Sequence, residues 1–411
     1  MTATAPQQQE NALAEGLALR RTPDPCALVI FGASGDLTHK KLMPALYALA
    51  VRRLLPQRFA IVGVARTEGG DDSFRDEMAT AVKQHARDPF RQDTWDELAA
   101  QLHYVATDFA DAGGEDKVHD LLGRLDEDEQ LDGNRVFYLS TPASFFPVIV
   151  GHMGEAGLNE PPGFARVVIE KPFGHDLQTS KALAETVHRS FEERQIYRID
   201  HYLGKETVQN IFVFRFANAI FEPVWTNRYV DHVQITVAES LGVEHRAAFY
   251  EETGVVRDIV QNHLLQVLAL VAMEPPAAFE ADAVRDEKTK VLRATRPLSF
   301  ENTVRGQYGR GFVAGEEVTA YAGEEGVPPD SNTPTFIAAK MEIDNWRWAG
   351  TPFYIRTGKR MPKRVSEVAV QFKRPPHLPF SKEASEHLEA NSLVLRIQPD
   401  EGISLRFGAK A

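Results

Sequence analysis

One short stretch gathers more reactive side chains than a solvated loop needs. Beginning at Arg198, it reads Arg-Ile-Asp-His-Tyr-Leu-Gly-Lys-Glu. Arg198 and Lys205 can neutralise a phosphate group. His201 and Tyr202 can donate hydrogen bonds to its oxygens, which leaves Asp200 to orient another residue that acts as a base. The stretch therefore predicts a phosphate-binding loop, with a charged segment at a strand exit as the alternative interpretation.

His263 is the candidate for that base. It lies on a helix expected from about Val255 to Leu270. It shares the apolar stripe of this helix with Val256, Val260 and Val267. Most inward-facing histidines belong to the core, but oxidation of an alcohol by hydride transfer needs a base, and imidazole titrates in the useful range. We expect Asp200 to bind the other ring nitrogen of His263.

Short apolar runs alternate with helical or polar segments in the first half of the chain. We expect strands at 27–31, 59–64, 102–106, 136–139, 167–169 and 195–199. This alternation is typical of a parallel sheet with crossover helices. The last strand delivers the reactive loop at its carboxyl end, where open parallel sheets bind ligands.

The second half of the chain has longer apolar runs joined by turns. We expect strands at 229–237, 336–343, 352–359, 365–372, 392–397 and 403–407. Pro399 to Gly402 has the composition of a hairpin turn, which favours a mainly antiparallel sheet. The predicted fold class is thus α/β plus α+β. A flexible leader at 1–26 precedes a Rossmann-like doubly wound domain at 27–204 and a substrate and dimerisation domain at 205–411.

A glycine turn joins the first strand to the first helix. Gly32 and Gly35 would let backbone amides and the helix N-terminus approach a pyrophosphate. The spacing is not a full G-x-G-x-x-G, so tight packing of helix on strand is the alternative reason for the glycines. The predicted dinucleotide contacts in this region are Gly32, Ser34, Gly35, Asp36, Leu37 and Lys41.

Two further residues bear on the cofactor. Arg66 follows the second strand, at the place where an enzyme that prefers NAD typically carries an acidic residue. Arg66 would pair with a 2′-phosphate, which favours NADP, whereas the nearby Glu68 leaves NAD as a secondary cofactor. Lys171, in a Glu-Lys-Pro-Phe-Gly stretch, is expected between sheet and cleft, where it would contact both nicotinamide and substrate. We expect no metal ligands.

The second half of the chain offers additional polar groups. Glu239 and Asp258 can accept hydrogen bonds from sugar hydroxyls, or they can be ordinary salt-bridge partners. Lys359 and Arg364 lie in a strongly basic run, Ile355 to Arg364. In a chain with a net charge of −12, such a run favours an anionic ligand over a plain basic loop.

Composition narrows the class of protein. The chain has 411 residues, enough for two domains. Its net charge of −12 disfavours nucleic acid as a partner, because phosphate backbones require a basic surface. Cys26 is the single cysteine, so no intramolecular disulfide forms and a cytoplasmic location fits. We find no signal peptide and no apolar run long enough to span a membrane.

Four motifs together resemble one family, glucose-6-phosphate dehydrogenase. In chain order they are Gly-Ala-Ser-Gly-Asp-Leu, Glu-Lys-Pro-Phe-Gly, Arg-Ile-Asp-His-Tyr-Leu-Gly-Lys-Glu and Arg-Asp-Ile-Val-Gln-Asn-His-Leu-Leu-Gln. The resemblance implies that His263 is the base, supported by Asp200. It implies a substrate site made of Lys171, His201, Tyr202, Lys205, Glu239, Asp258 and Lys359, with Arg364 and Gln398 in less distinctive stretches.

The resemblance also implies the reaction. D-glucose 6-phosphate would be oxidised to 6-phospho-D-glucono-1,5-lactone with NADP as hydride acceptor, the first oxidative step of the pentose phosphate pathway. It implies a homodimer or homotetramer assembled across the open sheet. Family chains continue past the segment that matches 402–407, so we expect the end of the sheet domain to be absent.

Two other readings of the sequence remain open. One is an oxidoreductase that shares the Rossmann domain, the Glu-Lys-Pro turn and the antiparallel sheet but acts on unphosphorylated sugars. The reactive loop argues against it. The other is a binding or regulatory homologue without turnover. Asp200, Lys171, Lys205 and His263 argue against that, because a binding protein does not need a base.

Overall fold

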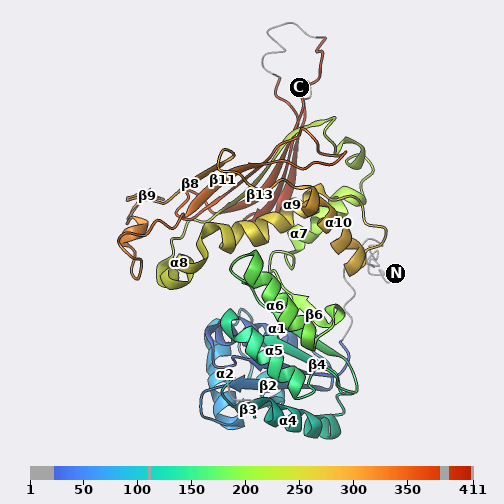
Figure 1. Ribbon diagram of the computed structural model, residues 1–411, viewed down its shortest axis with the longest axis vertical. Coiled ribbons are helices and arrows are strands. Elements are labelled where there is room, and N and C mark those ends of the chain that lie inside the picture. Colours follow the sequence, from blue (N-terminus) through green and yellow to red (C-terminus); the bar gives the residue numbers. More distant parts are fainter. Residues whose placement is uncertain (1–22, 110–112, 380–387, 409–411) are drawn as a thin grey trace, which may run out of the picture. The chain divides into compact units, whose positions relative to one another are not determined.

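The computed structural model describes residues 23–109, 113–379 and 388–408 of the chain. The chain divides into two compact units, here called the N-terminal unit, Met1–Ile199, and the C-terminal unit, Asp200–Ala411 (Figure 1). The sequence predicted the division slightly later, at 204/205. Residues 1–22 of the predicted leader lie outside the described residues, and the first strand begins at Cys26.

The N-terminal unit contains a six-stranded parallel sheet of order β3-β2-β1-β4-β5-β6. Its strands are β1 Cys26–Phe31, β2 Phe59–Ala65, β3 Leu102–Ala106, β4 Arg135–Leu139, β5 Ala165–Ile169 and β6 Ile196–Arg198. All six predicted strands are confirmed, within two residues at each end. The strand order reverses between β1 and β4, so the glycine turn after β1 lies at the switch point where such sheets bind ligands.

Helices cover both faces of this sheet. They are η2 Thr38–Leu42, α1 Met43–Val51, α2 Asp71–His85, α3 Gln92–Ala99, α4 Gly114–Glu129, α5 Phe146–Glu155 and α6 Leu177–Ser190. Alternate residues of β1 enter different cores: Val29 and Phe31 join one apolar cluster, and Ile30 joins another. Two cores on opposite faces confirm the doubly wound architecture. Cys26 is buried in the second core, and this burial raises the pKa of its thiol to about 11.

The C-terminal unit contains a seven-stranded sheet of order β15-β14-β13-β7-β12-β11-β8. Its strands are β7 Val230–Ala238, β8 Thr303–Gly306, β11 Phe336–Met341, β12 Phe353–Gly358, β13 Val365–Phe372, β14 Ser392–Gln398 and β15 Gly402–Arg406. All pairs are antiparallel except β7 with β12. The mainly antiparallel prediction is therefore confirmed, as is the hairpin between β14 and β15.

Helices pack along one face of the C-terminal sheet (Figure 1). They are α7 Glu206–Phe216, α8 Ala247–Val255, η7 Val256–Leu264, α9 Leu265–Ala272 and α10 Ala281–Ala294. The backbone of Gly254 is non-helical, with φ of 58°, so a new helical run starts at Val255, as the sequence predicted. Val233 and Ile235 of β7 point into the core beneath these helices, and Gln234 between them is exposed.

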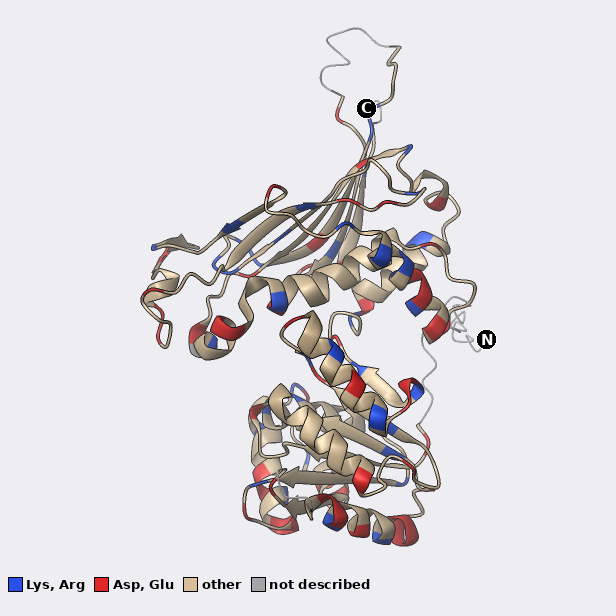
Figure 2. Cartoon of the chain, in the orientation of Figure 1, with Lys and Arg blue, Asp and Glu red and all other residues tan. Residues whose placement is uncertain are grey.

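The run from α8 to α9 is long and apolar. By length and composition alone, Ala247–Ala272 would pass as a membrane span, but 67% of the apolar window is buried inside the protein. It also carries the charged residues Arg257 and Asp258. We therefore read it as the central core helix of the C-terminal unit. Charged side chains of both signs lie along the more exposed helices of each unit, α4 and α10 for example (Figure 2).

Candidate active site

The loop that leaves β6 is organised by its own hydrogen bonds. The amide of Tyr202 donates to Asp200 Oδ1 at 2.9 Å. The amide of Leu203 donates to the carbonyl of Asp200 at 3.0 Å, and that of Lys205 to the carbonyl of Tyr202 at 3.2 Å. Lys205 is then the N-cap residue of α7. Two successive turns thus place Asp200, Tyr202 and Lys205 in the C-terminal unit, where Tyr202 joins the apolar core.

An acid–base pair connects this loop to η7. Asp200 Oδ1 and His263 Nδ1 are 2.6 Å apart, and the two side chains are 12% and 2% exposed. Burial is the largest single influence and would raise the pKa of Asp200, but the hydrogen bond and charge of His263, the amide of Tyr202 and the charge of His201 together outweigh it, so this pKa lies below its usual range. An ionised carboxylate can only accept, so Nδ1 of His263 donates the proton of this hydrogen bond, and Nε2 is the ring nitrogen that remains for a substrate. The predicted Asp200–His263 contact is therefore present.

Aromatic rings fix the orientation of His263. Its ring stacks on Tyr202 with centroids 4.2 Å apart and planes 16° apart, and meets the exposed ring of His201 edge-on at 4.5 Å. The ligand atoms of Asp200, His201 and His263 lie within 4.8 Å of one another, a spacing that could hold a metal ion. The expectation that no metal takes part stays a prediction.

Two cations gather at one end of this group. Lys205 Nζ lies 3.4 Å from the centroid of the Tyr202 ring. Burial, and then the nearby positive charge of Arg364, lower the pKa of Lys205 to about 8. The hydroxyls of Tyr202 and Ser366, a residue of β13, are 3.2 Å apart. Two cations that repel each other beside two hydroxyl groups form an arrangement that an anion would relieve.

A second cluster of charges surrounds Tyr250. Lys359 Nζ donates to Glu239 Oε2 at 2.7 Å and lies 5.2 Å from the Tyr250 ring. These two residues follow β12 and β7, the parallel pair of strands, so both leave the same end of the sheet. Burial, and then the charge of Asp258, raise the pKa of Tyr250. Burial raises the pKa of Tyr202, and the negative charge of Glu239 adds to this rise. Because Tyr202 stacks on His263, the charge of Glu239 connects this cluster to the Asp200–His263 pair.

The π-helical segment η7 carries both Asp258 and His263. Both side chains are buried, at 5% and 1% exposure of the residue. A π-helix closes its hydrogen bonds five residues apart, and these two residues are five positions apart, so they lie on the same side of the helix. In an ordinary α-helix, with about 3.6 residues per turn, positions five apart would point to different sides.

The predicted dinucleotide contacts lie around the turn after β1. Gly32 has φ of +87°, and a Cβ there would lie 2.6 Å from the carbonyl oxygen of Ser140. The amide of His39 is the first in the following helix to reach a carbonyl one turn back, that of Gly35 at 3.2 Å. The amides of Asp36, Leu37 and Thr38 therefore form the helix N-terminus, which suits a pyrophosphate.

Side chains around this turn agree with the prediction to different degrees. Thr67 donates to Ser34 Oγ at 3.1 Å, which ties the loop after β2 to the glycine turn. Arg66, next to Thr67, is exposed, with its guanidinium 5.8 Å from the ring of Phe145. The Asp36 carboxylate is 86% exposed and pairs with Lys40 at 2.9 Å, which leaves the backbone amide of Asp36 as the group for its predicted pyrophosphate contact. Lys41 is exposed on η2.

Two predicted ligands belong to the N-terminal unit. Lys171 follows β5 and is half-buried, and its proposed contacts with substrate and cofactor stay predictions. Arg198 ends β6, and its guanidinium donates to both carboxylate oxygens of Glu193, at 2.8 and 3.1 Å. A guanidinium already held by a carboxylate is poorly suited to neutralise a phosphate. We therefore drop Arg198 from the phosphate site.

Two family models cover nearly the whole chain. One, described as glucose-6-phosphate dehydrogenase, NAD binding domain, matches residues 29–210. The other, described as glucose-6-phosphate dehydrogenase, C-terminal domain, matches residues 212–411. The chain belongs to the glucose-6-phosphate dehydrogenase family. The recognition made from the four motifs is confirmed.

Individual relatives agree with this family assignment. Glucose-6-phosphate 1-dehydrogenase 2 of Mycobacterium tuberculosis is 49% identical over 397 residues, which are 95% of this chain and 77% of that protein. Glucose-6-phosphate 1-dehydrogenase of Aggregatibacter actinomycetemcomitans is 51% identical over 391 residues, 94% of this chain and 78% of that protein.

Solved structures of the family share the fold. A glucose-6-phosphate dehydrogenase in complex with its substrate glucose-6-phosphate matches with a TM-score of 0.86 at 36% identity, covering 94% of this chain and 78% of that one. Glucose-6-phosphate 1-dehydrogenase from Mycobacterium avium matches with a TM-score of 0.83 at 40% identity, covering 94% of this chain and 81% of that one.

Within this glucose-6-phosphate dehydrogenase family fold, sequence reasoning missed two contacts and placed one boundary differently. Ser366 pairs with Tyr202, and Tyr250 lies among the charges of the second cluster. Neither stands in a distinctive motif, although Ser366 is close to the basic run. The family models also meet at 210/212, whereas the compact units divide after Ile199. From Asp200 onward, the reactive loop thus belongs to the first family domain by sequence and to the second unit by packing.

Proposed function

We propose that this chain oxidises D-glucose 6-phosphate at its anomeric carbon, giving 6-phospho-D-glucono-1,5-lactone and a reduced nicotinamide dinucleotide. The observation that carries the proposal is the Asp200–His263 hydrogen bond of 2.6 Å beside the cation pair Lys205 and Arg364. The Asp200–His263 pair supplies a base, and the Lys205–Arg364 pair anchors a phosphate. The relatives named glucose-6-phosphate dehydrogenase support the same substrate.

His263 is the general base of this reaction. Its Nε2 takes the proton of the anomeric hydroxyl, while the Nδ1–H remains bonded to Asp200, whose charge stabilises the imidazolium. As the O–H electrons form the C=O bond, the anomeric C–H bond breaks and its electron pair leaves with the hydrogen as hydride. The nicotinamide ring, when bound, supplies the hydride acceptor. The imidazolium then returns its proton to water.

The remaining site residues position the sugar phosphate. Within the C-terminal unit, Lys205, Arg364, His201 and Tyr202 hold the phosphate, and Lys359, Glu239 and Asp258 bind the hydroxyls. Because a phosphate fixed at one end orients the anomeric carbon at the other, this binding contributes to the rate as well as to affinity. Arg364 is included in this group because its positive charge influences the ionisation of both Lys205 and Tyr202.

A direct assay tests the proposed function. Purified chain is mixed with NADP and either glucose 6-phosphate or glucose, and NADPH formation is followed by absorbance. We expect turnover with the 6-phosphate and at least a hundredfold lower kcat/KM with glucose, since the anchor would be lost. Preference for glucose would favour the unphosphorylated-sugar oxidoreductase. Binding of glucose 6-phosphate without turnover would favour the regulatory homologue.

We propose NADP as the preferred cofactor. The support is Arg66, an exposed cation directly after β2, the strand whose end normally reads the ribose. The residues at the turn also fit a dinucleotide, since Gly32 leaves a space that a Cβ would fill. The same assay with NAD in place of NADP measures the preference. A higher kcat/KM with NAD would contradict it.

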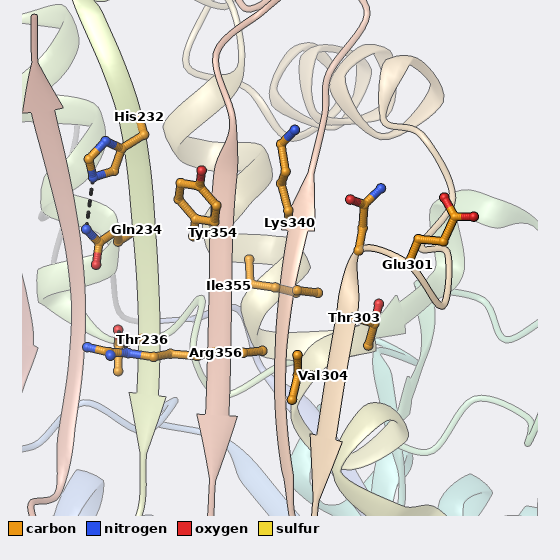
Figure 3. A pocket seen from close by; sticks show the side chains of 13 residues that line it. His232, Gln234, Thr236, Glu301, Thr303, Val304, Lys340, Tyr354, Ile355 and Arg356 are labelled. Carbon is orange, nitrogen blue, oxygen red and sulfur yellow. Dashed lines mark hydrogen bonds between the residues drawn. The ribbon is translucent and has the colours of Figure 1, made fainter.

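We also propose that the chain self-associates through the open face of the C-terminal sheet. A groove of about 500 Å³ crosses this face, lined by His232 and Gln234 of β7, Tyr354 and Arg356 of β12, and Val304 of β8 (Figure 3). Tyr354 and Val304 are 43% and 66% exposed. In a two-fold symmetric contact, each of the two chains would bury its own Tyr354 and Val304. Light scattering should give a dimer or tetramer that Tyr354→Glu dissociates, and a monomeric wild type would refute the proposal.

A further inference from the structure

The turn after β12 carries Lys359 and is fastened to the segment that follows β7. The amide of Arg360 donates to the carbonyl of Leu241 at 3.1 Å, and that of Met361 to the carbonyl of Glu239 at 2.9 Å. These bonds continue the strand pairing beyond the end of the sheet. They bring the backbone of Glu239 close to the turn whose Lys359 side chain it binds.

Arg360 has an unusual backbone in this turn. Its φ is +54°, a left-handed conformation that residues other than glycine rarely adopt. Such a conformation persists when the surrounding contacts enforce it. At Arg360 the side chain supplies that contact: Nη2 donates to Glu324 Oε1 at 3.0 Å, with side chains only 21% and 10% exposed.

Two further residues complete a small buried group. The hydroxyl of Tyr308 donates to the same Oε1 of Glu324 at 2.9 Å. Burial, and then this hydrogen bond, raise the pKa of Tyr308, so it remains a donor. A Cβ at Gly242 would lie 2.6 Å from Glu324 Oε1 and 2.8 Å from Arg360 Nε. The ion pair therefore rests directly on the backbone that follows β7.

The segment before β11 also holds the backbone of Lys359. The amide of Lys359 donates to the carbonyl of Thr335 at 3.0 Å. The hydroxyl of Thr335 accepts from the amide of Tyr308 at 2.9 Å. Segments after β7, after β8, before β11 and after β12 thus meet around one arginine and one glutamate, next to a residue of the substrate site.

We propose that the Arg360–Glu324 ion pair is a positioning device for Lys359. It holds the turn in its left-handed conformation and so directs Lys359 Nζ to Glu239, 2.7 Å away, with the lysine side chain only 9% exposed. The inference rests on the proposed function, since Lys359 and Glu239 are there the sugar contacts. Without the pair, the turn relaxes and the sugar end of the pocket loses its shape.

Four variants test the role of the pair. Glu324→Gln removes the charge with little change of shape, and Arg360→Met removes the guanidinium. Each should raise KM for glucose 6-phosphate about tenfold, change kcat less than about threefold and leave KM for NADP unaltered. The double variant should resemble Arg360→Met alone, because each change removes the same interaction. Arg360→Gly, which relieves the backbone, should retain most of the KM defect.

A matched control is the exposed pair Arg310–Glu317, with side chains 77% and 52% exposed. Glu317→Gln breaks a contact of the same chemistry and should leave KM unchanged. Direct titration of glucose 6-phosphate binding by calorimetry gives Kd independently of turnover. It therefore separates failure of this inference from failure of the proposed function, which would abolish turnover in the wild type.

Two outcomes would overturn the inference. If Glu324→Gln lowered the thermal midpoint but left KM and Kd for glucose 6-phosphate at wild-type values, the pair would only stabilise the fold. If Arg360→Gly restored wild-type KM in full, backbone freedom at this position would matter and the guanidinium would not.

Discussion

The two halves of the predicted chemistry are built in different ways. In the N-terminal unit, the cofactor turn relies on backbone, with a left-handed glycine and the amides of a helix N-terminus, and its charged side chains, such as Arg66, are exposed. In the C-terminal unit, His263 is buried, Asp200 is largely covered, and the two side chains orient each other. A backbone site tolerates change in its surroundings, whereas a buried polar site depends on every partner.

The largest effect is expected at the buried site. His263→Asn removes the base but keeps a polar side chain of similar size, so kcat should fall roughly 10²- to 10⁴-fold. Affinity for glucose 6-phosphate should change little, because the phosphate is held elsewhere. Steady-state kinetics and calorimetry measure the two quantities. The control is His119→Asn, an exposed histidine on α4.

Near-normal turnover of His263→Asn would remove the base from the proposed mechanism. It would also weaken the contrast between the two units, since the most deeply buried polar group would then have a structural role only.

The next effect concerns the phosphate anchor. Lys205→Met should raise KM for glucose 6-phosphate roughly 10²-fold and affect kcat less, because a charge-assisted contact to the phosphate is lost in ground state and transition state alike. Lys290→Met, at an exposed ion pair on α10, should have no such effect. Equal KM changes in both variants would argue against an anchoring role of Lys205.

The same lysine predicts a pH dependence. The pKa of Lys205 in the free protein is lowered to about 8, so the amine is charged below that pH and increasingly neutral above it. The substrate phosphate is a dianion throughout this range. KM for glucose 6-phosphate should therefore rise as pH increases beyond 8, by up to about tenfold per unit. Lys205→Arg keeps its charge and should flatten this rise, and an unchanged profile would refute the assignment.

The difference between the units also explains what the sequence could predict. The buried strands of the parallel sheet were placed within two residues, because short apolar runs between helices have few alternatives. The edge strand β8, Thr303–Gly306, was missed because it is short and none of its residues is buried. For the site, motifs identified His263 and Lys205. The partners Ser366, Tyr250 and Glu324 were not identified, since each gains its role only through a contact distant in sequence.

The glycine turn should respond through stability. Gly32→Ala places a methyl group against the Ser140 carbonyl and forces alanine to φ of +87°, so unfolding of the N-terminal unit should become easier by about 2 kcal/mol. Gly123→Ala, in helix α4 with nothing within 4 Å of its Cβ, should be neutral or stabilising. Thermal and urea unfolding measure both. Equal stability of the two variants would show that the turn is less constrained than its geometry indicates.

The smallest expected effect lies on the exposed side chains of the cofactor site. Arg66→Thr removes the cation that would pair with a 2′-phosphate, so kcat/KM with NADP should fall about tenfold while the value with NAD changes little. Glu68→Gln, two residues further along, should instead reduce use of NAD if that carboxylate reads the ribose. The ratio of the two kcat/KM values in each variant is the measurement. An unchanged ratio in Arg66→Thr would place the 2′-phosphate contact elsewhere in the N-terminal unit, with Lys41 the next residue to test, because a backbone-built site can choose between dinucleotides only through its side chains.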